Sequence, residues 1–264
     1  MDLTWLQTAG LLLLGVLAGG VGALTGIGGG LIVTPVLTLF FGVPIRYAIA
    51  TSLCCVIATS SGAAAAYVEQ RLTDVRLGMT LELTTTLGAV SGALVAGLVS
   101  REVLAVLFAF LLIYSGSSML RQSFKLRAAP PDDPNSYRLK HLPLGLLGGG
   151  VAGIVSGLLG VGGGIIQVPL MYLVMGVPFK VATATSNFMM GVTAAASAFI
   201  YYSRGDMLLL IAAPTAIGVY MGASLGAHVF RRAKSWGLKI LFSVLALYFA
   251  AMMLSKVLHG GFGH

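Results

Sequence analysis

Apolar runs long enough to cross a lipid bilayer recur along nearly the whole chain. A membrane-spanning helix needs roughly 20 apolar residues. Runs of this kind lie at Leu11–Leu24, Ile45–Val68, Leu77–Val99, Val103–Leu120, Leu144–Leu159, Val181–Tyr202, Met207–Ala227 and Leu238–Leu254. Only 9% of the 264 residues are charged, against about 25% in soluble domains. The sequence therefore predicts an all-α membrane protein with no room for a separate soluble domain.

The chain also carries an internal duplication. The stretch TGIGGGLIVTP at 25–35 returns as LGVGGGIIQVP at 159–169, and the tripeptides GVP and ATS follow each copy at the same offset of 134 residues. Repeated segments of this length indicate duplicated structural units. We expect a first transmembrane repeat at 1–124, a proline-rich and charged linker at 125–143, and a second repeat at 144–264.

Each repeat is predicted to hold about five helical segments. In the first repeat they lie at about 7–25, 30–42, 45–68, 77–99 and 102–121. The second segment contains Pro35 and is too short to cross a bilayer alone as a regular helix. It is expected to be a broken or re-entrant short helix, and the sequence leaves open whether it crosses or re-enters.

The basic residues predict how the repeats are oriented. If the linker faces the cytoplasm and each repeat crosses an odd number of times, only four of the sixteen Lys and Arg residues lie outside: Arg46, Arg101, Arg204 and Lys256. The other twelve lie on the cytoplasmic side, as the positive-inside rule requires. The two repeats are therefore expected to have inverted topologies, with both chain termini on the non-cytoplasmic side.

The duplicated glycines predict a break in each helix. A dinucleotide loop would need a preceding strand and a later acidic residue, and a Walker loop would need a Gly-Lys-Ser/Thr sequence; the chain has neither. Each glycine costs a helix interior roughly 1 kcal/mol relative to alanine, so three in a row indicate an intended interruption. Inverted-repeat transporters place such breaks at a midplane substrate site, where the amino ends of half-helices face anions.

Hydroxyl and amide side chains follow these breaks and are predicted to bind an oxyanion. The alternative, that the hydroxyls bond only to their own helix backbone, stays open. Gln167 and Asn187 replace Val33 and Leu53 of the first half. The candidate substrate-binding residues are Gly28, Gly29, Gly30, Thr51, Ser52, Gly162, Gly163, Gly164, Gln167, Thr185, Ser186 and Asn187.

Three charged residues complete the candidate site. Arg46 and Lys180 follow the two GVP turns and could attract an anion to the site entrances, although interfacial anchoring is an equal alternative. Glu82 lies inside an apolar segment and has no acidic counterpart in the second half, so it could carry a coupling proton. A position near the membrane interface is the other interpretation of Glu82.

The duplicated GIGGGLIVTPVL and GVGGGIIQVPLM, each followed by GVP and ATS, resemble the sulfite exporter TauE/SafE family over essentially the whole chain. This resemblance implies a secondary transporter in the inner membrane that exports sulfite or an organosulfonate such as sulfoacetate by alternating access. A passive anion channel and an accessory membrane subunit of a larger complex are the alternatives.

Other functions are less well supported by the sequence. The segment GASLG at 222–226 resembles the serine loop of an intramembrane protease. His228 lies four positions along the same predicted helix as Ser224, where it is poorly placed to take the serine proton, so no enzyme activity is expected. We expect no cofactor, no metal and no nucleic acid. The expected partners are a small anion and the lipid bilayer, and the sequence leaves open whether the chain forms a homodimer.

Overall fold

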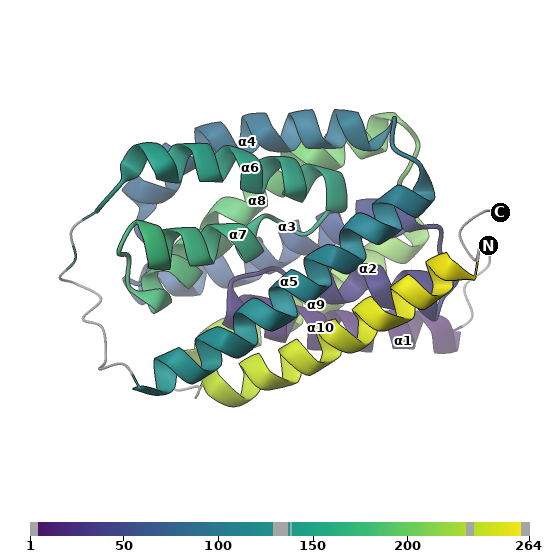
Figure 1. Cartoon of the computed structure of the whole chain (residues 1–264). Coiled ribbons are helices and arrows are strands. Elements are labelled where there is room, and N and C mark those ends of the chain that lie inside the picture. Colours follow the sequence, from purple (N-terminus) through teal and green to yellow (C-terminus); the bar gives the residue numbers. More distant parts are fainter. Residues whose placement is uncertain (1–4, 129–136, 138, 231–234, 260–264) are drawn as a thin grey trace.

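In the computed structural model the described residues, 5–128, 137, 139–230 and 235–259, form helices and short connections (Figure 1). The elements are α1 (Trp5–Thr25), α2 (Gly30–Leu39), α3 (Ile45–Glu69), α4 (Val75–Ala96), α5 (Arg101–Ala128), α6 (Leu142–Leu159), α7 (Gly164–Pro169), the π-helical η1 (Leu170–Val174), α8 (Phe179–Ser203), α9 (Leu209–Phe230) and α10 (Ser235–Leu258). The linker stretch 129–136 and four basic residues of the topology argument, Arg138, Arg231, Arg232 and Lys234, lie outside the described residues.

The five segments expected in the first half correspond to α1 through α5, with bounds that differ by a few residues. Within the described part of the chain, six helices are long and apolar enough to cross a membrane: α1, α3, α4, α6 and the stretches Arg101–Arg121 and Leu209–Val229. The helices α2 and α7 are much shorter and begin at the last glycine of each cluster, Gly30 and Gly164.

Glycines bring α1 against α9 and α4 against α6. A Cβ at Gly19 would lie 2.1 Å from the carbonyl oxygen of Val219, and one at Gly222 would lie 2.0 Å from that of Val16. The α4–α6 contact is built in the same way, since a Cβ at Gly92 would lie 2.1 Å from the carbonyl oxygen of Ile154. Only glycine permits backbones to approach this closely, as in many membrane helix pairs.

These pairings divide most of the helices into two arms. The first arm consists of α1, α2, α3 and α9, which share a buried cluster that includes Leu11, Val33 and Val219. The second arm consists of α6, α7, α8 and α4, with α7, α8 and α4 sharing a buried cluster that includes Leu77 and Val168. Each arm therefore contains one helix from the other half of the sequence. The arms meet along α3 and α8, while α5 and α10 pack on each other at the side.

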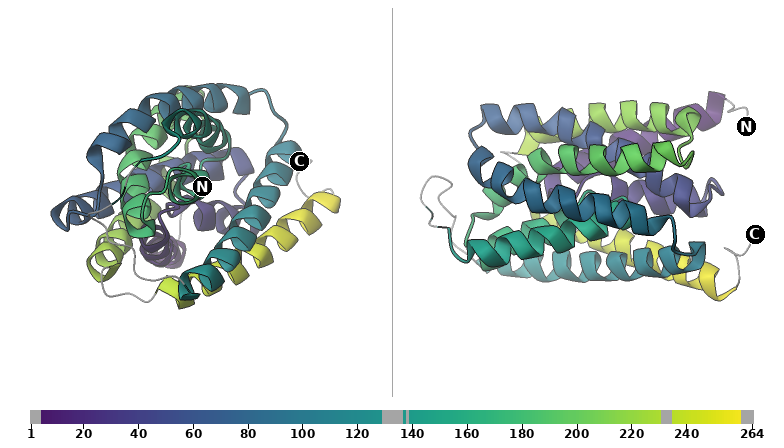
Figure 2. Two further views of the ribbon diagram at one scale, coloured as in Figure 1. Left: turned by 60° about the vertical axis from the view of Figure 1, so that its left-hand side comes forward. Right: turned by 90° about the horizontal axis from the view of Figure 1, so that it is seen from above.

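The first and the last helix share one end of the molecule. In both Figure 1 and the right view of Figure 2, α1 begins and α10 ends at the same end of the molecule, which we call the terminal end. The end of α5 and the start of α6 lie at the opposite end, which we call the linker end. The start of α3 lies at the terminal end, where the Arg46 side chain donates a hydrogen bond to the carbonyl oxygen of Val99 over 2.6 Å.

After each glycine cluster the chain returns toward the end from which it came. A Cβ at Gly10, early in α1, would lie 3.9 Å from the ring of Phe41, which follows α2. A Cβ at Gly145, early in α6, would likewise lie 2.6 Å from the sulfur of Met175, which follows η1. Each pair of segments is therefore a helical hairpin with its glycine break at the tip.

The glycine contact between α1 and α9 yields a prediction about stability. We expect Gly19→Ala to lower the free energy of unfolding by about 1–3 kcal/mol, because the added methyl group overlaps the Val219 backbone. Thermal unfolding in detergent measures the effect. Gly20→Ala is the matched control: its Cβ would lie 3.5 Å from the nearest atom, the Gly222 carbonyl oxygen. Equal unfolding temperatures for the two variants would contradict this account.

Candidate functional site

Both predicted breaks are present at the glycine clusters. α1 ends at Thr25 and α2 begins at Gly30, and the backbone between them has φ of 74° at Gly26 and 83° at Gly28. The second break has φ of 70° at Gly160, 77° at Gly162 and 73° at Gly163. This left-handed region is disfavoured for residues with a Cβ. The glycines therefore set the direction in which each short helix leaves the break.

The two breaks lie against each other, although 134 residues separate them in the sequence. A Cβ at Gly164 would lie 2.0 Å from the carbonyl oxygen of Gly26, and one at Gly30 would lie 2.7 Å from that of Gly160. The third glycine of each cluster is thus required for the contact between the loops. The structure brings Gly28, Gly29 and Gly30 together with Gly162, Gly163 and Gly164 at the junction of the arms.

A reciprocal pair of serines joins the breaks. The Ser52 hydroxyl donates to the carbonyl oxygen of Gly160, and the Ser186 hydroxyl donates to that of Gly26 over 3.1 Å. Ser52 and Ser186 are equivalent in the duplication, as are Gly26 and Gly160. Each half therefore donates a hydrogen bond to a carbonyl oxygen in the helix break of the other half. Both serines are fully buried.

The two amides are found only on the second arm. The Asn187 side chain donates to the carbonyl oxygens of Ala23, 3.1 Å away, and Thr183, 3.0 Å away. Gln167 accepts from the Ser186 hydroxyl over 3.3 Å and donates to the Thr85 hydroxyl over 3.4 Å. Both amides are buried, and they connect α4, α7, α8 and the end of α1.

The two threonines of the ATS motifs differ in their surroundings. The Thr51 hydroxyl is buried and has no hydrogen-bond partner among the described residues. The Thr185 hydroxyl accepts from the N–H of Asp74 over 3.0 Å. Asp74 caps the start of α4 and also accepts from the hydroxyl of Tyr137. Burial raises the pKa of Tyr137, and Asp74 raises it further, so this hydroxyl stays protonated and continues to donate.

Several residues of the site were missed by the sequence analysis. Val56 and Met190 lie between the two breaks, because a Cβ at either Gly28 or Gly162 would be within 3.3 Å of both side chains. Thr59 accepts from the N–H of Gly29 over 3.2 Å. The signal was available, since Val56 and Met190 are also 134 residues apart, but no charge or motif marks them.

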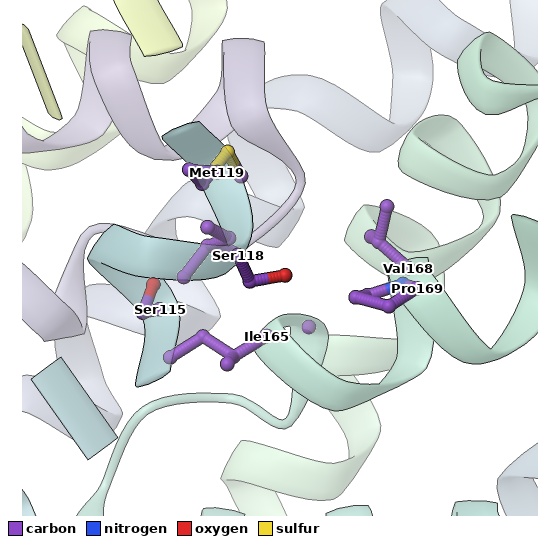
Figure 3. Close-up of a pocket in the computed structure, with 8 residues that line it drawn as sticks. Ser115, Ser118, Met119, Ile165, Val168 and Pro169 are labelled. Atoms are coloured by element: carbon purple, nitrogen blue, oxygen red, sulfur yellow. The ribbon is translucent and has the colours of Figure 1, made fainter. Parts of the chain in front are cut away.

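A small cavity adjoins the breaks on the side of α5. It offers about 10 Å³ to a water-sized molecule, and its lining includes Ile27, Gly164, Ser115 and Ser118. In Figure 3 Ser115 and Ser118 project from α5, with Ser118 directed toward Val168 and Pro169. The Ser115 hydroxyl is buried without a hydrogen-bond partner among the described residues. One water molecule needs about this much space, so a larger solute enters only if the helices move.

The predicted charged residues lie apart from one another. Arg46 donates to the carbonyl oxygens of Gly97 and Val99 at the terminal end, whereas Lys180 is exposed near the start of α8. Glu82 is only 8% exposed and faces α8. The structure thus brings together the glycines, serines and amides of the predicted site, but not its two cations.

Six apolar helices around a buried polar junction are typical of a multi-pass membrane protein. The comparison with protein families is specific: the family model described as sulfite exporter TauE/SafE matches residues 11–253. The chain belongs to this family, as its duplicated motifs predicted. No solved structure matches it significantly.

Curated relatives extend the comparison. The chain is 30% identical over 240 residues to the probable membrane transporter protein YunE of Bacillus subtilis, covering 84% of this chain and 88% of that protein. It is 27% identical over 248 residues to the probable membrane transporter protein MJ0441 of Methanocaldococcus jannaschii, covering 88% and 90%. It is also 34% identical over 119 residues to the sulfite exporter TauE/SafE family protein 3 of Arabidopsis thaliana, covering 43% and 24%. The family and these names indicate a membrane transporter, which agrees with the prediction that the chain is not an enzyme.

The reciprocal serine bonds yield a prediction. We expect Ser52→Ala and Ser186→Ala each to lower the free energy of unfolding by about 0.5–2 kcal/mol, because a buried glycine carbonyl loses its partner. Thermal unfolding in detergent measures the loss. Ser91→Ala serves as the control, since Ser91 is exposed and donates only to Leu87 of its own helix. Unchanged unfolding temperatures for both site variants would show that these bonds do not hold the breaks together.

Proposed function

We propose that this chain is a secondary transporter that exports a small sulfur-containing anion, sulfite or an organosulfonate such as sulfoacetate, across the inner membrane by alternating access. The observation that carries the proposal is the reciprocal contact of the two glycine breaks through Ser52 and Ser186. Hydroxyl donors from both halves and the amide donors of Gln167 and Asn187 from the second half lie at this buried junction.

The donors at this junction suit an oxyanion. Broken helices leave N–H groups in their first turn without intrahelical carbonyl partners, and the positive end of the helix dipole favours a negative charge there. Ser52, Ser186 and Asn187 now donate to backbone carbonyls. An anion that enters between the breaks would take over these donors when the loops separate.

Inverted repeats are part of the proposal. The start of α1 and the end of α10 lie at one end of the molecule, and the end of α5 and the start of α6 lie at the other (Figure 2), as expected if each half crosses the membrane an odd number of times. The pairing of α1 with α9 and of α4 with α6 is also what exchange of equivalent helices across a two-fold axis would produce. In this scheme α1–α2 and α6–α7 are re-entrant hairpins that approach the substrate from opposite sides.

The two arms are the proposed moving parts. Rocking of one arm against the other along the α3–α8 contact would open the junction alternately to each end, as in other inverted-repeat transporters. The excess of basic residues predicted on the linker side favours a cytoplasmic linker and non-cytoplasmic termini. Arg46 at the terminal end and Lys180 at the linker end would attract anions to the two entrances.

Transport into liposomes tests the proposal. Purified protein should catalyse saturable exchange of labelled sulfite or sulfoacetate. Single-channel currents proportional to voltage would instead favour the passive channel, and movement that requires an added protein would favour the accessory subunit. A wild-type protein that moves neither anion under any of these conditions would refute the proposed function.

A variant locates the site. We expect Asn187→Leu to reduce exchange about 10- to 100-fold, because a lost hydrogen bond to a charged ligand is worth about 1.5–3 kcal/mol. Leucine already occupies the equivalent position, Leu53, so its shape is compatible with the fold. The matched control is Gln70→Leu, which removes an amide that donates to Ala227 away from the junction. Equal exchange rates in both variants would exclude Asn187 from the site.

A further inference from the structure

Glu82 is a buried carboxyl group that the anion site does not explain. It is the eighth residue of α4, about 10 Å along the helix axis from the start of α4. One carboxylate oxygen accepts from the hydroxyls of Thr86 and Thr193, each 2.7 Å away. The other oxygen is buried without a hydrogen-bond partner among the described residues. The side chain thus lies buried in the contact between α4 and α8.

Within the described residues, no cation forms an ion pair with this carboxyl group. The only other ionisable side chain of α4 itself is Arg76, six residues away, and α6 has none. On α8, Lys180 lies thirteen residues before Thr193. Arg204, directly after α8, lies eleven residues beyond Thr193, where it pairs with Asp206 and donates to the carbonyl oxygen of Ala93. The groups that face Glu82 are therefore hydroxyls and apolar side chains. An ionised carboxylate held here without a partner charge would cost several kcal/mol, and an added proton removes that cost.

We infer that Glu82 is a proton-binding site whose occupancy is linked to anion binding at the glycine breaks. This inference rests on the proposed function and adds its coupling ion. In the conformation described, the carboxyl group carries a proton taken from water, which makes it neutral. When the arms separate and water reaches the α4–α8 contact, the proton leaves to water and the carboxylate is hydrated.

The duplication connects Glu82 to the site. Thr193 is the equivalent of Thr59, and the Thr59 hydroxyl accepts from the N–H of Gly29 in the first break. In the second half the corresponding hydroxyl donates to Glu82 instead. Thr85, one helical turn further along α4, accepts from Gln167, which in turn accepts from Ser186. Glu82 therefore lies one helical turn from the polar contacts that hold the second break.

The sign of the linkage follows from charge. An anion at the breaks and an ionised Glu82 would repel each other in a poorly screened interior. Protonation removes this repulsion, so the anion binds more tightly to the protonated form and, by reciprocity, the bound anion favours the proton. Anion and proton are then expected to move in the same direction.

The first experiment detects the proton itself. Infrared spectra of purified protein at neutral pH should contain a carbonyl band of a protonated carboxyl group that disappears in Glu82→Gln. Glu102→Gln is the control, because Glu102 is exposed at the start of α5, and it should leave the band unchanged. Absence of a Glu82-dependent band would overturn this inference but would not contradict the proposed anion transport.

The second experiment measures the linkage. Sulfoacetate binding is titrated across neutral pH, where both of its acidic groups stay ionised. The wild-type affinity should rise by up to about tenfold per pH unit of acidification, the limit for one linked proton. In Glu82→Gln it should change by less than about twofold. An equal pH dependence in both proteins would refute the linkage. If neither sulfoacetate nor sulfite binds the wild type, the proposed function fails, and the infrared band alone decides whether Glu82 holds a proton.

Discussion

A broken backbone inside a membrane must find its hydrogen-bond partners within the protein. Here the two glycine breaks provide partners for each other, since Ser52 bonds to Gly160 and Ser186 bonds to Gly26. Each break would lose this hydrogen-bond partner if the other were absent. The same requirement explains why the cluster occurs twice: a single copy would leave the exposed carbonyls and N–H groups of its loop against lipid or an empty space.

The swapped packing of the arms protects this contact. Because α9 packs on α1 through Gly19 and Gly222, and α4 packs on α6 through Gly92, neither half of the chain can move away as a unit. Without a hydrophobic driving force between helices in lipid, close backbone contact is the main source of such association. Two equivalent glycine interfaces therefore hold the helices of each arm together. The α3–α8 contact between the arms, which includes the small side chains around the breaks, contains fewer close backbone contacts.

Much of this arrangement could be predicted from the sequence, but its three-dimensional pairing could not. The run lengths located α1 and α3 through α6 closely, and Gly28 and Gly162 marked the breaks because three glycines are so unfavourable in a helix. The offset of 134 correctly paired Ser52 with Ser186. No periodicity indicated that each serine bonds to the opposite loop, or that α4 and α9 each pack in the arm of the other half. These features depend on contacts between residues far apart in the chain. Val56 and Met190 were missed for a simpler reason: apolar side chains carry no chemical mark of a central position.

The duplicated fold carries an unequal set of polar groups. At two equivalent pairs of positions the first half has an apolar residue where the second half has an amide: Val33 against Gln167, and Leu53 against Asn187. An apolar residue at each of these positions is evidently compatible with the fold, because the first half contains it. The polar groups of the second half are therefore not needed to build the hairpin. Burying them costs free energy that the first half avoids, and a cost of this kind at a membrane-embedded junction is expected where the groups serve a ligand. The proposed transport function then assigns recognition of the solute and its proton to the second arm, and not to the two arms equally.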